Sequence, residues 1–166
     1  MPFDEAAPQS RTVLRDAILA GASLVAGEAD RAWVVAFSDG ADNASWIEPS
    51  ELVDGLMHTN IVLDCVLVNP DTTADLDVAY GDFRSQSEKL TKPTGGLVFD
   101  GQADDLLERL RKRADELRSS YVLTFKPTGV KQGDGFHKLS VKLKGGSDVG
   151  IVQTRSGYYS TLRPGR

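Results

Sequence analysis

The chain of 166 residues is poor in the residue types that build disulfides and zinc sites. It has one cysteine, Cys65, and two histidines, His58 and His137, which lie far apart with no cysteine at ligand spacing. An internal disulfide is therefore excluded, and a zinc site is not indicated. Cys65 lies within an apolar run, so we interpret it as a small core residue rather than a nucleophile.

Long apolar runs and an excess of positive charge are also missing. No stretch approaches the roughly 18 apolar residues that a membrane-spanning helix needs. The net charge of −5 gives no electrostatic case for binding nucleic acid or an anionic membrane. The first residues have neither a basic segment nor an apolar segment, so no signal peptide is predicted. The composition is that of an ordinary globular protein of about one domain.

A continuous apolar run organises the first part of the chain. Residues 32–37 are all apolar, and they lead into a polar loop that contains Asp39 and Asp42. Such a run is typical of a strand buried on both faces of a parallel sheet. Ligands of such sheets sit at the carboxyl ends of the strands, which is where Asp39 would lie.

Helical periodicity and apolar runs alternate between residues 11 and 118. The expected helices and strands are, in order, helix 12–27, strand 32–37, helix 49–57, strand 61–68, helix 82–90, strand 97–99 and helix 102–117. This alternation predicts an α/β fold, a Rossmann-like layer structure in which helices flank a mostly parallel sheet.

The pattern changes after Ser120. Residues 139–144 alternate apolar and polar side chains, residues 149–154 do so less cleanly, and residues 121–125 are a further candidate strand that ends before Pro127. Glycine-rich segments join the three. This period of two predicts a C-terminal antiparallel extension of three strands with one face in water. The expected organisation is a flexible lead-in (1–10), an α/β domain (11–118), a β extension packed on it (119–160) and a tail (161–166).

Several segments, in order along the chain, resemble the von Willebrand factor type A (vWA) domain, and specifically its bacterial VWFA-related subgroup. They are residues 11–17 (RTVLRDA, second metal-site loop), 35–43 (VAFSDGADN, strand and third loop), 90–99 (LTKPTGGLVF, strand entry), 116–123 (ELRSSYVL, helix-to-strand junction), 136–141 (FHKLSV) and 155–159 (RSGYY). Proteins of this resemblance are often exported, although this chain has no export signal of its own.

The resemblance implies an incomplete metal-ion-dependent adhesion site. Family members carry a D-x-S-x-S strand that binds the cation together with a Thr and an Asp, and this chain has no D-x-S-x-S. The remaining ligands would be Thr12 and Asp39. Mg²⁺ needs near-octahedral oxygen coordination, so we expect at most a weak site for Mg²⁺ or Mn²⁺ and no other cofactor. The partner-binding residues around it would be Ser38, Gly40, Asp42, Asn43 and Trp46.

The missing strand also has a consequence for the sheet. Without it, the strand at 32–37 becomes an edge, and an apolar unpaired edge is prone to pair with another chain. The predicted function is a non-enzymatic vWA-like protein-binding module that uses the Asp39 loop. The alternative is a truncated or split structural domain that self-associates, or pairs with another chain, through residues 32–37. A metal-assisted hydrolase using Asp39 and Asp42 would lack a base and a nucleophile.

Simpler interpretations exist for each of these residues. Asp39 and Asp42 are ordinary turn formers, because their side chains bind nearby backbone, and Thr12 can be a helix cap. The basic run at 109–113 is typical of a solvated helix face. Asp64 interrupts an apolar strand and needs a loop or backbone donor, because unpaired burial is costly. Trp46 is expected to be exposed near the acidic loop.

Overall fold

The computed structural model describes residues 11–26, 31–68, 76–128, 135–144 and 152–159. Its elements are, in chain order, α1 (Leu14–Val25), β1 (Ala32–Ser38), α2 (Pro49–Met57), β2 (Ile61–Leu67), α3 (Leu76–Thr91), the 3₁₀ helix η1 (Lys92–Thr94), β3 (Val98–Asp100), α4 (Leu106–Arg118), β4 (Phe136–Lys138) and β5 (Gly157–Tyr159). No helix among the described residues combines the length and apolarity needed to cross a bilayer.

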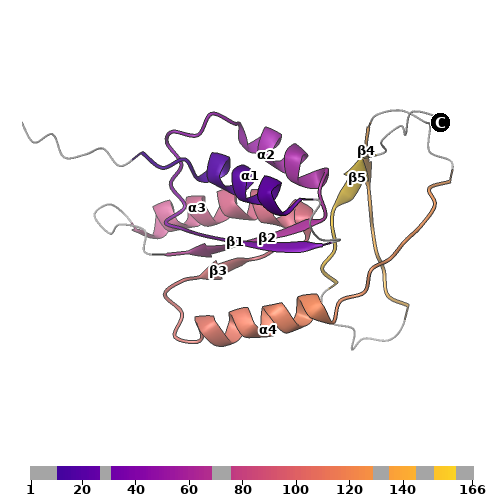
Figure 1. Cartoon of the computed structure of the whole chain (residues 1–166). Coiled ribbons are helices and arrows are strands. Elements are labelled where there is room, and N and C mark those ends of the chain that lie inside the picture. Colours follow the sequence, from indigo (N-terminus) through magenta and orange to yellow (C-terminus); the bar gives the residue numbers. More distant parts are fainter. Residues whose placement is uncertain (1–10, 27–30, 69–75, 129–134, 145–151, 160–166) are drawn as a thin grey trace, which may run out of the picture.

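The first three strands form a parallel sheet in the order β1-β2-β3. β1 pairs with β2 along its whole length, from Ala32 opposite Ile61 to Ser38 opposite Leu67. Helices α1, α2 and α3 lie on one face of this sheet and α4 lies on the other (Figure 1). The predicted α/β layer structure with a parallel sheet and flanking helices is confirmed.

The core lies between the sheet and the helices α1, α2 and α3. All seven residues of β2 are buried, and Leu63, Cys65 and Leu67 contact a cluster that includes Leu52 and Leu56 of α2. The six apolar residues of β1 are only half-buried or exposed. The prediction that residues 32–37 are buried on both faces is therefore wrong. β1 lies at the edge of the described sheet with a neighbouring strand on one side only, so its side chains stay more exposed to solvent than those of β2.

The predicted helices and strands are present with shifted ends. α2 spans the predicted range, and its capping box joins Glu48 to Glu51. α1 begins at Leu14 rather than residue 12, and α3 begins at Leu76, six residues before the prediction. α4 begins at Leu106 rather than 102, because residues 101–105 form turns in which Gln102 N donates to Asp100 Oδ1 at 2.9 Å.

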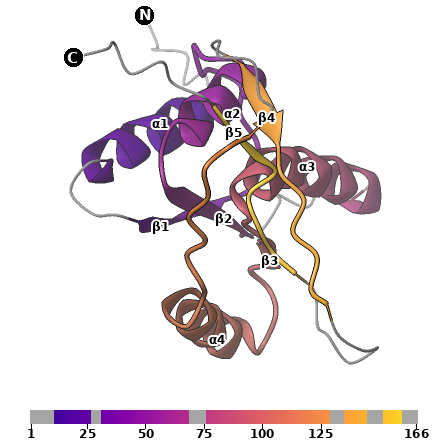
Figure 2. The same ribbon diagram turned by 90° about the vertical axis from the view of Figure 1, so that its right-hand side faces the viewer.

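The C-terminal region has two strands where three were predicted. β4 and β5 pair antiparallel, with Phe136 opposite Tyr159. Residues 121–125 and 139–144 form no strand, and neither do residues 152–154, the described part of 149–154. Residues 121–128 instead run from the end of α4 past the sheet toward β4 (Figure 2). Alternation predicts a strand with two unlike faces, but it does not name the strand that pairs with it.

The C-terminal residues dock on the α/β layer mainly through polar contacts. The guanidinium of Arg155 donates to Leu56 O at 3.3 Å and Met57 O at 3.0 Å, at the carboxyl end of α2. Burial lowers the pKa of this guanidinium. Tyr159 Oη donates to Asp54 Oδ1 at 2.6 Å, and its ring stacks on His58 at 4.2 Å. His58 is the C-cap residue of α2.

Candidate functional site

The acidic loop, residues 38–46, follows β1 at the carboxyl end of the sheet. Gly40 N donates to Ser38 Oγ at 3.0 Å, and Ala41 N donates to Asp39 Oδ1 at 2.9 Å, so the first two side chains hold a tight turn. Gly40 has a φ of 89°, and a Cβ there would lie 2.7 Å from the Cβ of Phe83. Glycine is therefore required at this turn by both backbone conformation and space.

Asp42 and Ser45 cap the N-terminus of α1 from outside the helix. The backbone N–H of Arg15 donates to Asp42 Oδ2 at 2.8 Å, and Ser45 Oγ donates to the same oxygen at 2.7 Å. Burial raises the pKa of Asp42, but these hydrogen bonds and the charge of Arg15 outweigh it and hold the pKa below its usual value. The helix has no side-chain cap of its own at Val13, so the loop supplies one.

Two further contacts fix the acidic loop to α1. Thr12 N donates to Asn43 Oδ1 at 2.9 Å, and Asn43 N donates back to Thr12 O at 3.2 Å. Asp16 in α1 accepts hydrogen bonds from the backbone N–H groups of Trp46, at 3.0 Å, and Ile47, at 3.2 Å. The side chain of Trp46 is 92% exposed, as predicted, while its backbone is held. Hydrogen bonds in both directions therefore hold the acidic loop against the start of α1.

The residues that the resemblance implies for a divalent cation all make hydrogen bonds within the protein. Asp39 and Asp42 accept hydrogen bonds from backbone N–H groups, and Thr12 contacts Asn43 through its backbone. No group of three or more His, Cys, Asp or Glu among the described residues is arranged to hold a metal. The structure brings Asp42 and Asn43 against the segment around Thr12, and it places Asp39 in the preceding turn. The turn interpretation describes Asp39 and Asp42, whose side chains accept hydrogen bonds from nearby backbone N–H groups. Thr12 is not the helix cap, because the N-cap residue of α1 is Val13.

The free edge of β1 is the second feature of this region. Ala32 N donates to Asn60 O, and Val68 N donates to Ser38 O, so the even-numbered residues of β1 direct their backbone groups toward β2. Backbone groups alternate sides along a strand, so Trp33, Val35 and Phe37 direct theirs away from β2. Among the described residues, no strand pairs on that side.

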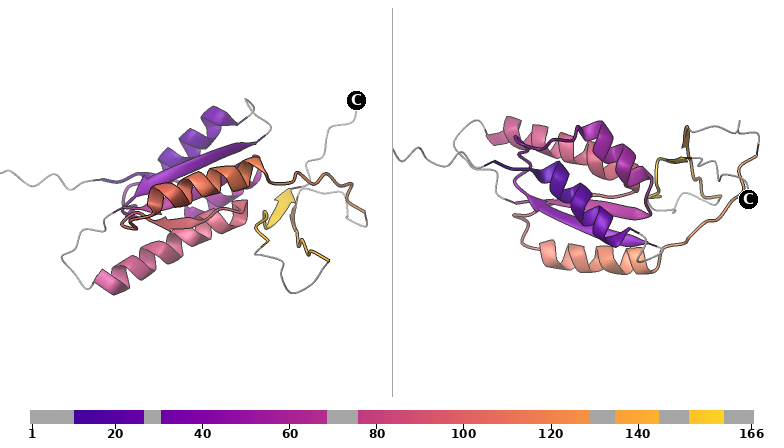
Figure 3. Two further views of the ribbon diagram at one scale, coloured as in Figure 1. Left: turned by 90° about the horizontal axis from the view of Figure 1, so that it is seen from below. Right: turned by 45° about the horizontal axis from the view of Figure 1, so that its top comes forward.

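The predicted edge is therefore confirmed for the described part of the sheet. Phe37, near the end of β1, is 59% exposed, although every side chain of the neighbouring strand is buried. On the face of the sheet opposite α1, α2 and α3, α4 covers the middle, between β1 and β3 (Figure 3). Phe37 stays exposed. An apolar side chain beside outward-facing backbone groups is the arrangement that natural sheets usually protect.

A buried ion pair that the sequence analysis missed joins β2 to α4. Arg113 Nε lies 2.9 Å from Asp64 Oδ2, and both side chains are almost completely buried. Trp33 Nε1 donates to the same carboxylate at 2.8 Å, and Leu97 N donates to it at 2.7 Å. The expected backbone donor to Asp64 is confirmed, but the solvated-face interpretation of the basic run is wrong for Arg113. The isolated Asp in an apolar strand was the signal for a buried partner.

Arg113 also joins the layer to the C-terminal region. Its Nη1 donates to Gln153 Oε1 at 2.6 Å, and its Nη2 donates to Gly95 O at 3.0 Å. The guanidinium therefore binds the sheet, the turn before β3 and the C-terminal segment together. This network is fully engaged among its own members, so we assign it a structural role.

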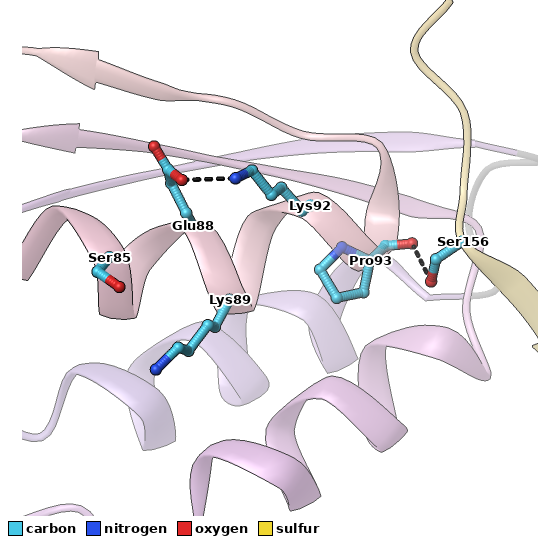
Figure 4. A pocket seen from close by; sticks show the side chains of 6 residues that line it. All are labelled: Ser85, Glu88, Lys89, Lys92, Pro93 and Ser156. Carbon is cyan, nitrogen blue, oxygen red and sulfur yellow. Dashed lines mark hydrogen bonds and ion pairs between the residues drawn. The ribbon is translucent and has the colours of Figure 1, made fainter.

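The buried Cys65 does not have the properties of a reactive thiol. Burial, and then the charge of Asp64, raises the pKa of the Cys65 thiol to about 12, so the thiolate is scarce at neutral pH. The core interpretation of Cys65 is confirmed. A hollow where α3 and η1 meet the C-terminal segment is shown in Figure 4. In it Lys92 Nζ lies 2.6 Å from Glu88 Oε2, a contact that lowers the pKa of Glu88.

No family model matches the chain, and comparisons with curated proteins and with solved structures found no match. The vWA resemblance therefore stays a prediction that rests on the segments quoted above.

Proposed function

We propose that this chain is a non-enzymatic protein-binding module that pairs with a second polypeptide, a second copy or another chain, through the β1 edge. The observation that carries the proposal is the contrast between two neighbouring strands. β2 is buried along its whole length, whereas β1 ends the described sheet with Phe37 exposed and three residues directing backbone groups outward. Strand addition to such an edge supplies main-chain hydrogen bonds and apolar contacts together.

The order of the matching segments and the parallel sheet support the vWA-like origin of the layer. In that interpretation, β1 is the strand that would lie beside the absent D-x-S-x-S strand. The hydrogen bonds of the acidic loop favour binding without a cation. A contact through the acidic loop is a second candidate, favoured by the exposed side chain of Trp46 on a fixed backbone. Exposed aromatic residues on rigid supports commonly anchor interfaces.

Self-association tests the form of the proposal in which the partner is a second copy of the chain. Phe37→Lys places a charge at the edge, which is a device that natural sheets use against pairing. Leu107→Lys is the matched control, because Leu107 is 61% exposed, close to the 59% of Phe37, and belongs to α4 rather than to β1. Sedimentation velocity over a range of concentrations should show association that Phe37→Lys weakens by about tenfold or more and Leu107→Lys leaves unchanged. A monomer at every concentration, or equal effects of both substitutions, would contradict self-association.

A further inference from the structure

We propose that residues 121–125, the strap, add to the free edge of β1 as a fourth parallel strand of the same molecule and so compete with the binding partner. The inference rests on the proposed function, because it names what regulates the same edge. The strap has the sequence Tyr-Val-Leu-Thr-Phe, which is rich in β-branched and aromatic residues, and Pro127 follows it. In the arrangement of Figure 1 it forms no strand, and Tyr121, Val122 and Leu123 are exposed.

The start of the strap already lies at the correct end of β1. The guanidinium of Arg31, the residue before β1, donates to the hydroxyl of Ser120, the residue before the strap. α4 runs antiparallel to the strands, so a chain that turns back after Ser120 would run parallel to β1 (Figures 1 and 3). Residues 119 and 120 would form the connection, and helix-to-strand connections of about two residues are common.

The position of α4 selects the β1 edge over the β3 edge. The connections β1–α2–β2 and β2–α3–β3 advance in one direction with their helices on one face of the sheet. Crossovers between parallel strands are almost always right-handed, so a helix on the opposite face returns the chain in the opposite direction. α4 follows β3 on the opposite face and lies between β1 and β3 (Figure 3). The next strand would then occupy the first free position in that direction, which is beside β1.

The strap also has a suitable length and composition for this edge. Five residues in a strand span about 17 Å, against about 23 Å for the seven residues of β1. Apolar residues on both of its faces suit a position in a parallel sheet, which is covered on both sides. In the described arrangement its one ring contact is Phe125 with Tyr158, at 5.4 Å between centroids. Among the ring contacts of the described residues, moving the strap would therefore give up only this edge-on pair, and it would gain a strand pairing.

Amide exchange measured by NMR on the full chain tests the proposal. Trp33, Val35 and Phe37 are the reporters, because their N–H groups point outward, and Val34 and Ala36 are internal references that bond to β2. Leu123→Pro removes a backbone donor and fixes φ at the centre of the strap, which disfavours strand pairing, and it breaks no hydrogen bond among the described residues. Leu143→Pro is the matched control, since Leu143 is 57% exposed, Leu123 is 68% exposed, and both lie outside regular elements. Leu123→Asp is a second variant with an intact backbone.

The reporters should exchange at least about tenfold more slowly in the wild type and in Leu143→Pro than in either Leu123 variant, at every protein concentration. Equal rapid exchange in all four proteins would overturn the proposal, and so would protection that appears only as concentration rises, because that pattern indicates a second copy. Sedimentation of Leu123→Pro separates this inference from the proposed function. Leu123→Pro should associate more strongly than the wild type, because its β1 edge is free. If Leu123→Pro stays monomeric while its reporter amides still exchange faster than those of the wild type, the proposed binding function is contradicted and the strap inference stands.

Discussion

The α/β layer and the C-terminal region are built in different ways. In the layer, all seven residues of β2 are buried, and its apolar residues belong to one continuous core with residues of α1, α2 and α3. After Ser120 most large apolar side chains of the described residues are exposed, and polar contacts from Gln153, Arg155, Ser156 and Tyr159 hold the region to the layer. The layer therefore carries the stability, and the C-terminal region carries the surfaces available for exchange of partners.

This difference predicts the order in which substitutions lower the free energy of unfolding. A side chain that holds both regions should matter most when it is removed, a contact of the C-terminal region alone should matter less, and a loop contact at the rim of the layer should matter least. Three substitutions test this order.

Arg113 belongs to both regions, and its removal should have the largest effect. Arg113→Met leaves Asp64 buried without its ionic partner, so the free energy of unfolding should fall by about 3–5 kcal/mol. Arg111→Met on the exposed face of the same helix should change it by less than about 0.5 kcal/mol. Chemical denaturation measures both values.

The double variant Asp64→Asn/Arg113→Met separates the cost of an unpaired charge from a loss of packing. It should recover part of the lost stability, because the amide leaves no buried charge and its oxygen still accepts the hydrogen bond from Leu97 N. The recovery is incomplete because the amide nitrogen cannot accept the hydrogen bond from Trp33 Nε1. If the double variant is as unstable as Arg113→Met, the contact of Arg113 with Gln153 and Gly95, rather than the ion pair, is the important one.

Arg155 holds the C-terminal region to the end of α2, and its loss should have an intermediate effect. Arg155→Met keeps the aliphatic stem and removes the donors to Leu56 O and Met57 O, which should lower the free energy of unfolding by about 1–3 kcal/mol. NMR spectra should show altered shifts for His58 and Tyr159, whose stacking depends on the docking, with unchanged core amides in β2. Lys142→Met, at an exposed position, is the control.

A different outcome would break the comparison between the two regions. If Arg155→Met moves the amides of β2 as much as those of β5, the C-terminal residues are part of the same cooperative unit as the sheet. The distinction between a core layer and a docked region would then be wrong.

The sequence predicted the layer well because its signals are local. The apolar run at 61–68 and the helical stripe at 49–57 each indicate an element, and the alternation of elements implies a parallel sheet. Relative burial of the two long strands was not predictable from apolarity, because 32–37 and 61–68 look alike. What distinguishes them is the number of neighbouring strands, which is a property of the whole sheet.

The candidate site was predicted in position but not in its contacts. The sequence indicated that the Asp39 loop lies at the end of β1, and turn chemistry was weighed against a cation. The distant partners of the loop were not predictable, because Asp42 caps a helix 27 residues earlier in the chain. Asp64 and Arg113 are 49 positions apart, so the charge run around Arg113 gave no sign that one of its members is buried. The prediction of three C-terminal strands was wrong for the same reason, since alternation within a segment does not specify which other segment pairs with it.

Asp42 gives the smallest expected effect and one with a defined pH dependence. Its pKa is lower in the folded protein than the ordinary value of about 3.9, so ionised Asp42 stabilises the fold above that value. The stabilisation is lost as the pH falls through the folded pKa. Asp42→Asn should therefore lower the free energy of unfolding by about 1 kcal/mol at neutral pH. The difference from the wild type should shrink toward acid pH, where the wild-type carboxyl is also uncharged.

Asp104→Asn is the control, because Asp104 is exposed and lies in the turn before α4. Urea denaturation of the wild type and both variants between about pH 2 and about pH 7 gives the comparison. A constant difference between wild type and Asp42→Asn across that range would mean that shape rather than charge connects the acidic loop to α1. Because the loop touches only the rim of the layer, even its complete loss should leave β2 protected from amide exchange, whereas Arg113→Met should expose it.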